Sequence, residues 1–116
     1  MTALPDPQQV KDEIAREIAR VHAESYGEAA TNVEVSLHES FVAVVMDVDL
    51  SRAEQVLVDA GDLGAVRNGR EAFQAVIGDT FRAIVERATG RRVDGFASRM
   101  VIGERPPWAV ELFRLA

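Results

Sequence analysis

The residue types best suited to metal binding lie near the middle of the chain. His38 precedes Asp47 and Asp49, and a pair of strands could bring the histidine close to one of the carboxylates. Such an oxygen-rich site would suit magnesium or manganese. The spacing is generic, however, because an aspartate at the end of a strand is common. We therefore expect no metal site and no cofactor, and a metal-dependent enzyme is only an alternative.

The other histidine, His22, lies near the end of a predicted helix. The helix dipole favours a histidine at this place, whereas a proton carrier would need a polar partner that the sequence does not identify. The chain has no cysteine, which excludes thiol nucleophiles and thiolate metal sites. It also contains no nucleophile elbow, phosphate loop or dinucleotide fingerprint. We therefore predict no catalytic residue and expect that the protein is not an enzyme.

Arginines gather towards the C-terminal end of the chain. Arg87, Arg91 and Arg92 surround the predicted end of a long helix, and Arg99 and Arg105 follow. Positive side chains there offset the negative end of the helix dipole, which is the simplest explanation. They could alternatively bind a small anion, a nucleotide or an acidic partner. The candidate binding residues are Arg87, Arg91, Arg92 and Arg99.

The net charge of −6 is unevenly distributed. Residues 1–66 contain 4 basic and 13 acidic residues, whereas residues 82–116 contain 7 basic and 4 acidic residues. The acidic balance argues against nucleic-acid binding, which needs many phosphate contacts. The longest apolar run, residues 41–46, is far shorter than the roughly 20 residues of a membrane span, and residues 1–7 do not resemble a signal peptide. Without disulfides, we expect a cytoplasmic protein that reaches a membrane only through a partner or a surface contact.

Two helices are predicted from their capping residues. Asp6 and Pro7 begin the first helix as N-cap and first helical residue, apolar residues then recur every three or four positions, and Gly27 ends it. Ser51 and Glu54 form a capping box that begins a second, short helix. Each helix is thus delimited by local chemistry.

A third helix follows the second directly. The second should end near Gly61, and Asp62 caps the third, which runs until Gly90. Gly69 and Gly78 lower its helix propensity slightly and could let another element approach closely. The apolar residues expected to face the core are Val66, Phe73, Val76, Ile77, Phe81, Ile84, Val85 and Ala88.

Four strands are predicted from alternation and β-branched residues. Residues 33–37 alternate between apolar and polar, and residues 41–48 are nearly all apolar, so that the two form an antiparallel hairpin around a short turn. Residues 91–102 favour a strand with a bend or bulge at Gly95. Residues 109–115 fit either a strand or a short helix, and we favour a strand.

The predicted order is α-β-β-α-α-β-β, which is an α+β fold. We expect one domain over residues 1–116, with a mainly antiparallel four-stranded sheet and the helices packed on one face. Exposed sheet edges could pair two copies across a two-fold axis, and we expect a homodimer. Trp108 and Phe113 are the candidate interface residues, because aromatic side chains are enriched at interfaces, although Trp108 could instead seal the edge of the core.

Several short segments resemble one known family over nearly the whole chain. They include Ile14–His22 followed by Tyr26–Gly27, and the blocks 50–54, 66–73, 89–93 and 110–115 in the same order. Together they resemble the MpsC-like family of small bacterial proteins. One departure is the loop at 28–30, where the family often has a basic residue and a Gly-Pro pair.

The resemblance implies a partner rather than a reaction. The family is associated with a sodium-translocating, membrane-potential-generating system that is linked to inorganic-carbon uptake, and the resemblance transfers no catalytic residue. It implies a non-catalytic accessory or regulatory protein of a membrane ion or inorganic-carbon transport system. The alternatives are a domain that senses a small anion or nucleotide through the arginines, and a metal-dependent enzyme.

Overall fold

The computed structural model describes residues 6–28 and 30–116. Residues 1–5, where we expect no signal peptide, and Ala29 in the departing loop lie outside the described residues. The elements follow the predicted order α-β-β-α-α-β-β. They are α1 (Pro7–Tyr26), β1 (Thr31–Leu37), β2 (Phe41–Asp47), α2 (Arg52–Asp59), α3 (Leu63–Thr89), β3 (Val93–Val101) and β4 (Trp108–Leu115).

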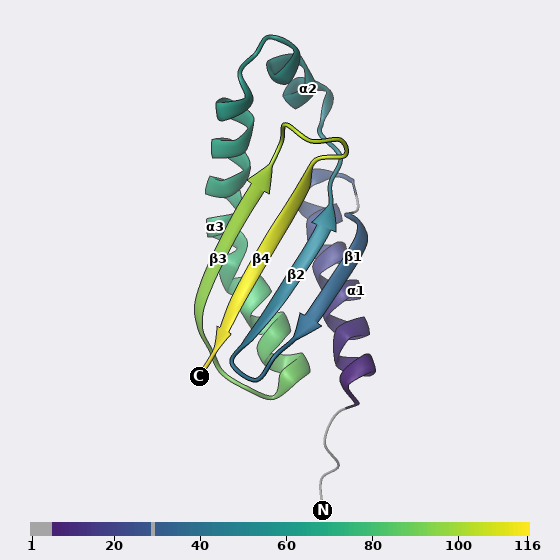
Figure 1. The fold of residues 1–116 in the computed structure, drawn as a ribbon, viewed down its shortest axis with the longest axis vertical. Coiled ribbons are helices and arrows are strands. Elements are labelled where there is room, and N and C mark those ends of the chain that lie inside the picture. The colour runs from purple at the N-terminus through teal and green to yellow at the C-terminus, as the bar shows by residue number, and fades with distance from the viewer. Residues whose placement is uncertain (1–5, 29) are drawn as a thin grey trace, which may run out of the picture.

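The four strands form one antiparallel sheet in the order β1-β2-β4-β3. The two hairpins, β1–β2 and β3–β4, are joined along β2 and β4 at the centre. Helices α1 and α3 cover one face of this sheet, whereas the short α2 lies beyond one end of it (Figure 1). The prediction of an α+β fold with the long helices on one face is confirmed.

The predicted helix ends are confirmed in atomic detail. Asp6 accepts a 2.8 Å hydrogen bond from the backbone of Gln8, and Gly27 ends α1 with a left-handed φ of 80°. Ser51 and Glu54 make both hydrogen bonds of the capping box. These contacts span only two or three residues, so the sequence alone is enough to predict them.

The last element is a strand, as favoured over a short helix. Every second residue of β4 faces the helices, and Ala109, Glu111, Phe113 and Leu115 are all buried. Phe113 is fully buried and packs against Phe96, with ring centroids 5.2 Å apart. It therefore belongs to the core of a single chain, and its predicted place in a subunit interface is wrong. A period of two buries this side chain against α1 and α3 instead.

Helix α3 faces the core differently from the prediction. Phe73 and Val76, which we expected in the core, are 40% and 77% exposed, whereas Arg70 and Gln74 are buried. The buried residues Val66, Arg70, Gln74, Gly78, Phe81, Val85 and Ala88 follow one stripe at spacings of three and four. The helix is thus turned so that two polar side chains lie inside.

A glycine lets this helix approach the sheet closely. A Cβ atom on Gly78 would come within 3.0 Å of the Phe96 ring, so only glycine fits there without a shift. The prediction of a close approach is confirmed at Gly78, whereas a Cβ atom at Gly69 would meet nothing. The expected irregularity near Gly95 is also present, as a shift of register between Val93 and Gly95.

Within the part of the chain that the structure describes, no helix combines the length and apolar character that crossing a membrane requires.

Candidate functional site

A group of polar side chains surrounds Arg70, which is only 2% exposed. Its Nε and one terminal nitrogen (Nη2) donate to the two carboxylate oxygens of Glu54 at 2.6 and 2.7 Å. The same Nη2 donates to the backbone carbonyl of Asp49 at 2.9 Å. Arg70 thus ties α3 to α2 and to the end of β2 with a bidentate ion pair, the strongest geometry for such a contact.

The C-terminal end of α1 completes this group. His22 and Tyr26 are four residues apart and therefore share one face of the helix. The guanidinium of Arg70 lies 4.0 Å from the centroid of the Tyr26 ring, a cation–π distance, and its Nη1 lies 3.5 Å from Nε2 of His22. We call the residues His22, Tyr26, Glu54 and Arg70 the Arg70 cluster.

His22 and Glu54, two titratable partners of Arg70, differ in charge state, because the imidazole is neutral and the carboxyl group is ionised. Burial lowers the pKa of His22, and the nearby guanidinium lowers it further, so the imidazole is neutral at pH 7. Its Nδ1 lies 3.0 Å from the carbonyl of Glu28, so Nδ1 carries the hydrogen and Nε2 faces Arg70 as an acceptor. Burial raises the pKa of Glu54, but the hydrogen bonds from Arg70 and Ser51 outweigh it and leave the pKa below its usual value.

A second set of polar groups lies deeper in the core. Gln74 and Glu111 are fully buried, and none of their side-chain polar atoms has a hydrogen-bond partner among the described residues. Burial raises the pKa of Glu111 to about 8, and Ser98, opposite it on β3, acts in the other direction. Burial likewise raises the pKa of Tyr26 to about 12. Glu111 is therefore mostly protonated and uncharged at neutral pH.

Apolar residues are exposed on α2 and α3, and two of them, Leu57 and Phe73, lie beside the Arg70 cluster. The full set consists of Val56, Leu57, Leu63, Phe73 and Val76, which are between 39% and 77% exposed. We call them the helix patch. A pocket of about 310 Å³ lies between the two, and Leu57, Phe73, Tyr26 and Arg70 line it. The phenol ring of Tyr26 also packs against Phe73, with ring centroids 5.2 Å apart.

The structure separates the predicted arginine residues. Arg87, Arg91 and Arg92 lie where α3 turns into β3, whereas Arg99 is seven residues further along β3, roughly 20 Å away by the rise of a strand. Arg91 donates to the backbone carbonyls of Glu39 and Ala116, and so fastens the C-terminal end to the β1–β2 turn. Binding of an anion by these residues stays a prediction.

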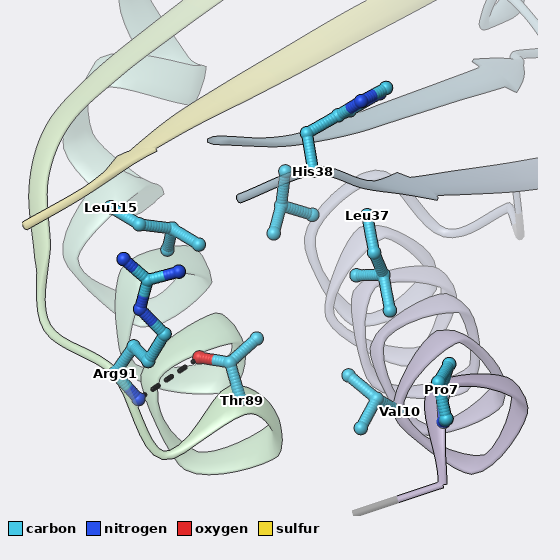
Figure 2. A pocket seen from close by; sticks show the side chains of 8 residues that line it. Pro7, Val10, Leu37, His38, Thr89, Arg91 and Leu115 are labelled. Atoms are coloured by element: carbon cyan, nitrogen blue, oxygen red, sulfur yellow. Dashed lines mark hydrogen bonds between the residues drawn. The ribbon is translucent and has the colours of Figure 1, made fainter. Parts of the chain in front are cut away.

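A pocket of about 180 Å³ lies beside Arg91, and Figure 2 shows its lining. Most of the lining is aliphatic and comes from Val10, Leu37 and Leu115, and the ring of His38 is directed away from Val10 (Figure 2). Among the described residues that line this pocket, Arg91 is the only arginine or lysine. A bound anion would have to displace at least one of the carbonyl contacts of Arg91.

The histidine and aspartates weighed as metal ligands do not converge. In the β1–β2 register, Asp47 pairs with Thr31 at one end, whereas His38 lies at the turn, where it stacks on Phe41 at 4.1 Å. Asp47 instead accepts a 2.7 Å hydrogen bond from Asn32. A hairpin pairs residues symmetrically about its turn, so residues 38 and 47 are held apart. Among residues 6–28 and 30–116, no group of three or more acidic or histidine residues could hold a metal ion.

Comparison with protein families identifies the chain. Residues 7–102 match the family described as Na⁺-translocating membrane potential-generating system (MpsC). This chain belongs to the MpsC family. No curated protein and no solved structure matches it.

The MpsC match covers the elements from α1 to β3, and therefore all four members of the Arg70 cluster. In this MpsC-family chain, Arg70 donates to Glu54, to a backbone carbonyl and to Nε2 of His22, and its guanidinium lies over the ring of Tyr26. The arrangement holds α1, α2 and α3 in fixed positions around one charge, and this positions the helix patch above it.

Sequence patterns contain a signal for the residues that our prediction omitted. Arg70 and Gln74 continue the spacing of four that starts at Val66, so they lie on the core stripe of α3. Glu111 likewise lies two residues before Phe113 on β4, so the two side chains point to the same face of the sheet. We had interpreted apolar residues alone as core residues, and this criterion misses buried polar ones.

Proposed function

We propose that this chain is a non-catalytic cytoplasmic accessory protein of a membrane ion or inorganic-carbon transport system, and that it acts by binding other proteins. The observation that carries the proposal is the match to the MpsC family, whose description names a Na⁺-translocating, membrane potential-generating system. Such a system needs membrane-embedded subunits, so an accessory chain has partners with loops at the membrane surface.

The helix patch supports docking to a membrane-embedded subunit. Val76 is 77% exposed and Val56 is 61% exposed, and they belong to a group that a soluble chain without a partner has little reason to expose together. Because the Arg70 cluster fixes α2 against α3, the patch is a preformed surface. Binding to a preformed surface loses less conformational entropy than binding to a flexible one.

Charge supports the same class of partner. Residues 1–66, which include α1, β1, β2 and α2, carry 13 acidic and 4 basic residues. The cytoplasmic loops of integral membrane proteins are enriched in lysine and arginine. An acidic accessory protein therefore complements the basic loops of a membrane-embedded subunit and would approach them faster at low ionic strength.

The proposal is tested with native membranes from the organism that encodes the chain. The tagged protein should sediment with these membranes and, after mild cross-linking, should be attached to an integral membrane protein that transports ions. The variant Phe73→Ser/Val76→Ser should lose this attachment, and about 0.5 M salt should weaken it because the Debye length shrinks. Ala83→Ser, at another exposed position on α3, is the matched control and should behave like the wild type.

Two results would overturn the proposed docking. One is a wild-type chain that stays wholly in the supernatant under several mild conditions. The other is a Phe73→Ser/Val76→Ser variant that cross-links to the same membrane protein as efficiently as the control.

A homodimer is part of the same proposal. The edges of the sheet are β1 and β3, and both have an irregular register near one end. Such irregularities disfavour continuous pairing of edges between copies. The face of the sheet is the better candidate.

A further inference from the structure

The sheet face that points away from α1 and α3 is apolar at its centre. Val45, Val110 and Leu112 point to this side, and Val45 and Leu112 are 38% and 42% exposed. No described element covers this face, which is turned towards the viewer in Figure 1. Antiparallel sheets with one solvated face usually carry polar side chains there, so this pattern indicates a protein contact.

We infer that a second copy of this chain covers this face and forms an isologous dimer. The two-fold axis lies between the two sheets, above the gap between β2 and β4, and runs parallel to the strands. The inference rests on the protein-binding role proposed above and names one partner. Two sheets packed in this way lie about 10 Å apart. The axis places β1 above β3 of the second copy and β2 above its β4. A row of residues that are paired across the four strands then lies above the same row of the other copy.

Charge favours this axis. Glu34 pairs with Val45, Val45 with Val110, and Val110 with Arg99, so that one row carries an acid at one edge and a base at the other. The axis along the strands places Glu34 above Arg99 of the second copy, twice in the dimer. An axis across the strands along this row would instead place Glu34 above Glu34 and Arg99 above Arg99, and like charges repel.

Arg99 is available for this contact. Its side chain is 76% exposed, and its ion pair with Glu71 is long, at 3.9 Å. An exposed pair of this kind contributes little to stability. The guanidinium can therefore turn to the carboxylate of the second copy at little loss.

The shapes of facing rows also fit. The next row contains Ala43 on β2 and Leu112 on β4, so the axis places each leucine above an alanine of the other copy. A hollow of about 300 Å³ lies beside Leu112, where Gly95 and Ala97 carry little or no side chain. Large side chains therefore face small ones, as close packing between sheets requires.

The opposite edge of the sheet supplies a side chain for the hollow. The backbone N–H of His38 donates to the carbonyl of Phe41, so the two residues are opposite each other and their rings stack. Phe41 pairs with Arg114, and Arg114 pairs with Gly95. The axis therefore places the exposed His38 of one copy above Gly95 of the other.

The area of the outer sheet face indicates how strong the dimer can be. Four strands spaced about 4.8 Å apart, with about seven residues each, give a flat area of about 450 Å² per copy. Stable complexes bury about 800 Å² of accessible surface per partner. We therefore expect a reversible dimer, whose population depends on concentration.

The first experiment measures mass by light scattering and sedimentation equilibrium over a concentration series of the purified chain. The wild type should shift from monomer to dimer as its concentration rises. Leu112→Glu places a charge at the centre of the interface and should be monomeric at every concentration, with an unchanged circular dichroism spectrum. A wild-type chain that is monomeric throughout, or a Leu112→Glu variant that dimerises normally, overturns the inference.

The second experiment identifies the axis. Glu34→Arg alone and Arg99→Glu alone place like charges above each other, and each should weaken dimerisation about tenfold. An equal mixture of the two variants should restore it, because both facing pairs in the mixed dimer are then of opposite charge. The double variant Glu34→Arg/Arg99→Glu should also dimerise like the wild type. If neither the mixture nor the double variant recovers, this axis is wrong.

These results are independent of docking to a membrane subunit. The dimer is measured without membranes, and the substitutions lie on the sheet face, away from the helix patch. Failure of the dimer would leave the membrane experiment intact, and failure of the membrane experiment would leave the dimer intact.

Discussion

Glu111 and Leu112 are neighbours on β4, and they point to opposite sides of the sheet. The glutamate is fully buried against the helices, whereas the leucine is 42% exposed. Arg70 and Gln74 extend the polar character inside, and Val45 and Val110 extend the apolar character outside. Each side departs from the arrangement that would best stabilise a single isolated chain. The buried polar side chains on the inner side hold the helices in place, and the exposed apolar side chains on the outer side favour a contact with another molecule.

Removal of the charge at Arg70 should have the largest effect on the inner side. Arg70→Met leaves the carboxylate of Glu54 half-buried without its partner, and we expect a loss of about 4 kcal/mol in the free energy of unfolding. Urea denaturation followed by circular dichroism measures it. The double variant Arg70→Met/Glu54→Gln should recover part of the loss because no charge is then left unpaired. A loss below about 1 kcal/mol would show that the cluster does not hold the helices together.

The buried carboxyl group of Glu111 should make stability depend on pH. Its folded pKa of about 8 exceeds the ordinary value of 4.5, so the folded chain keeps a proton that the unfolded chain releases. The contribution of this group is full below pH 4.5 and falls as pH rises towards 8, by about 3 kcal/mol between pH 4.5 and pH 7.

The effect of Glu111 is measured as the difference between two curves of unfolding free energy against pH. The free energy of unfolding is determined from pH 4.5 to 9 for the wild type and for Glu111→Gln, which cannot titrate. Subtraction cancels the groups that titrate in both proteins, such as His22 and Glu54. The wild type should lose stability relative to the variant across this range, and parallel curves would contradict the assignment.

The ends of the helices could be predicted from the sequence, whereas the contacts inside the polar core could not. Asp6 caps a residue two positions away, and Ser51 caps one three positions away, so local chemistry decides both. Arg70 is buried because Glu54, 16 residues earlier, comes to meet it. That partner depends on how α2 folds back on α3, and no short pattern contains this information.

The candidate site shows the same division between local and distant contacts. The sequence placed Trp108 at the edge of the core or at an interface, and the structure shows it half-buried on the outer face of β4, where its indole N–H donates to Glu104. The four predicted arginines were grouped by their proximity in sequence. Because β3 runs away from the end of α3, the fold separates Arg99 from the other three.

Replacement of the buried Gln74 by leucine should stabilise the folded chain. Its amide oxygen and nitrogen are buried with no partner among the described residues, and such groups lower stability. Gln74→Leu has a similar volume and should raise the free energy of unfolding by about 1.5 kcal/mol. Gln55→Leu, at an exposed position on α2, is the matched control and should change it little. A loss of stability in Gln74→Leu would show that the amide has a partner, such as a buried water molecule.

The smallest effect is expected on the outer side of the sheet. Leu112→Ser removes an exposed side chain from a monomer, so at high dilution the free energy of unfolding should change by no more than about 0.5 kcal/mol. At concentrations where the wild type is dimeric, the difference between the two proteins should grow, because association stabilises the folded wild type by mass action. Thermal melts at two concentrations a hundredfold apart measure this. A difference that does not depend on concentration would mean that Leu112 acts within one chain, and the outer face would then have no role in pairing.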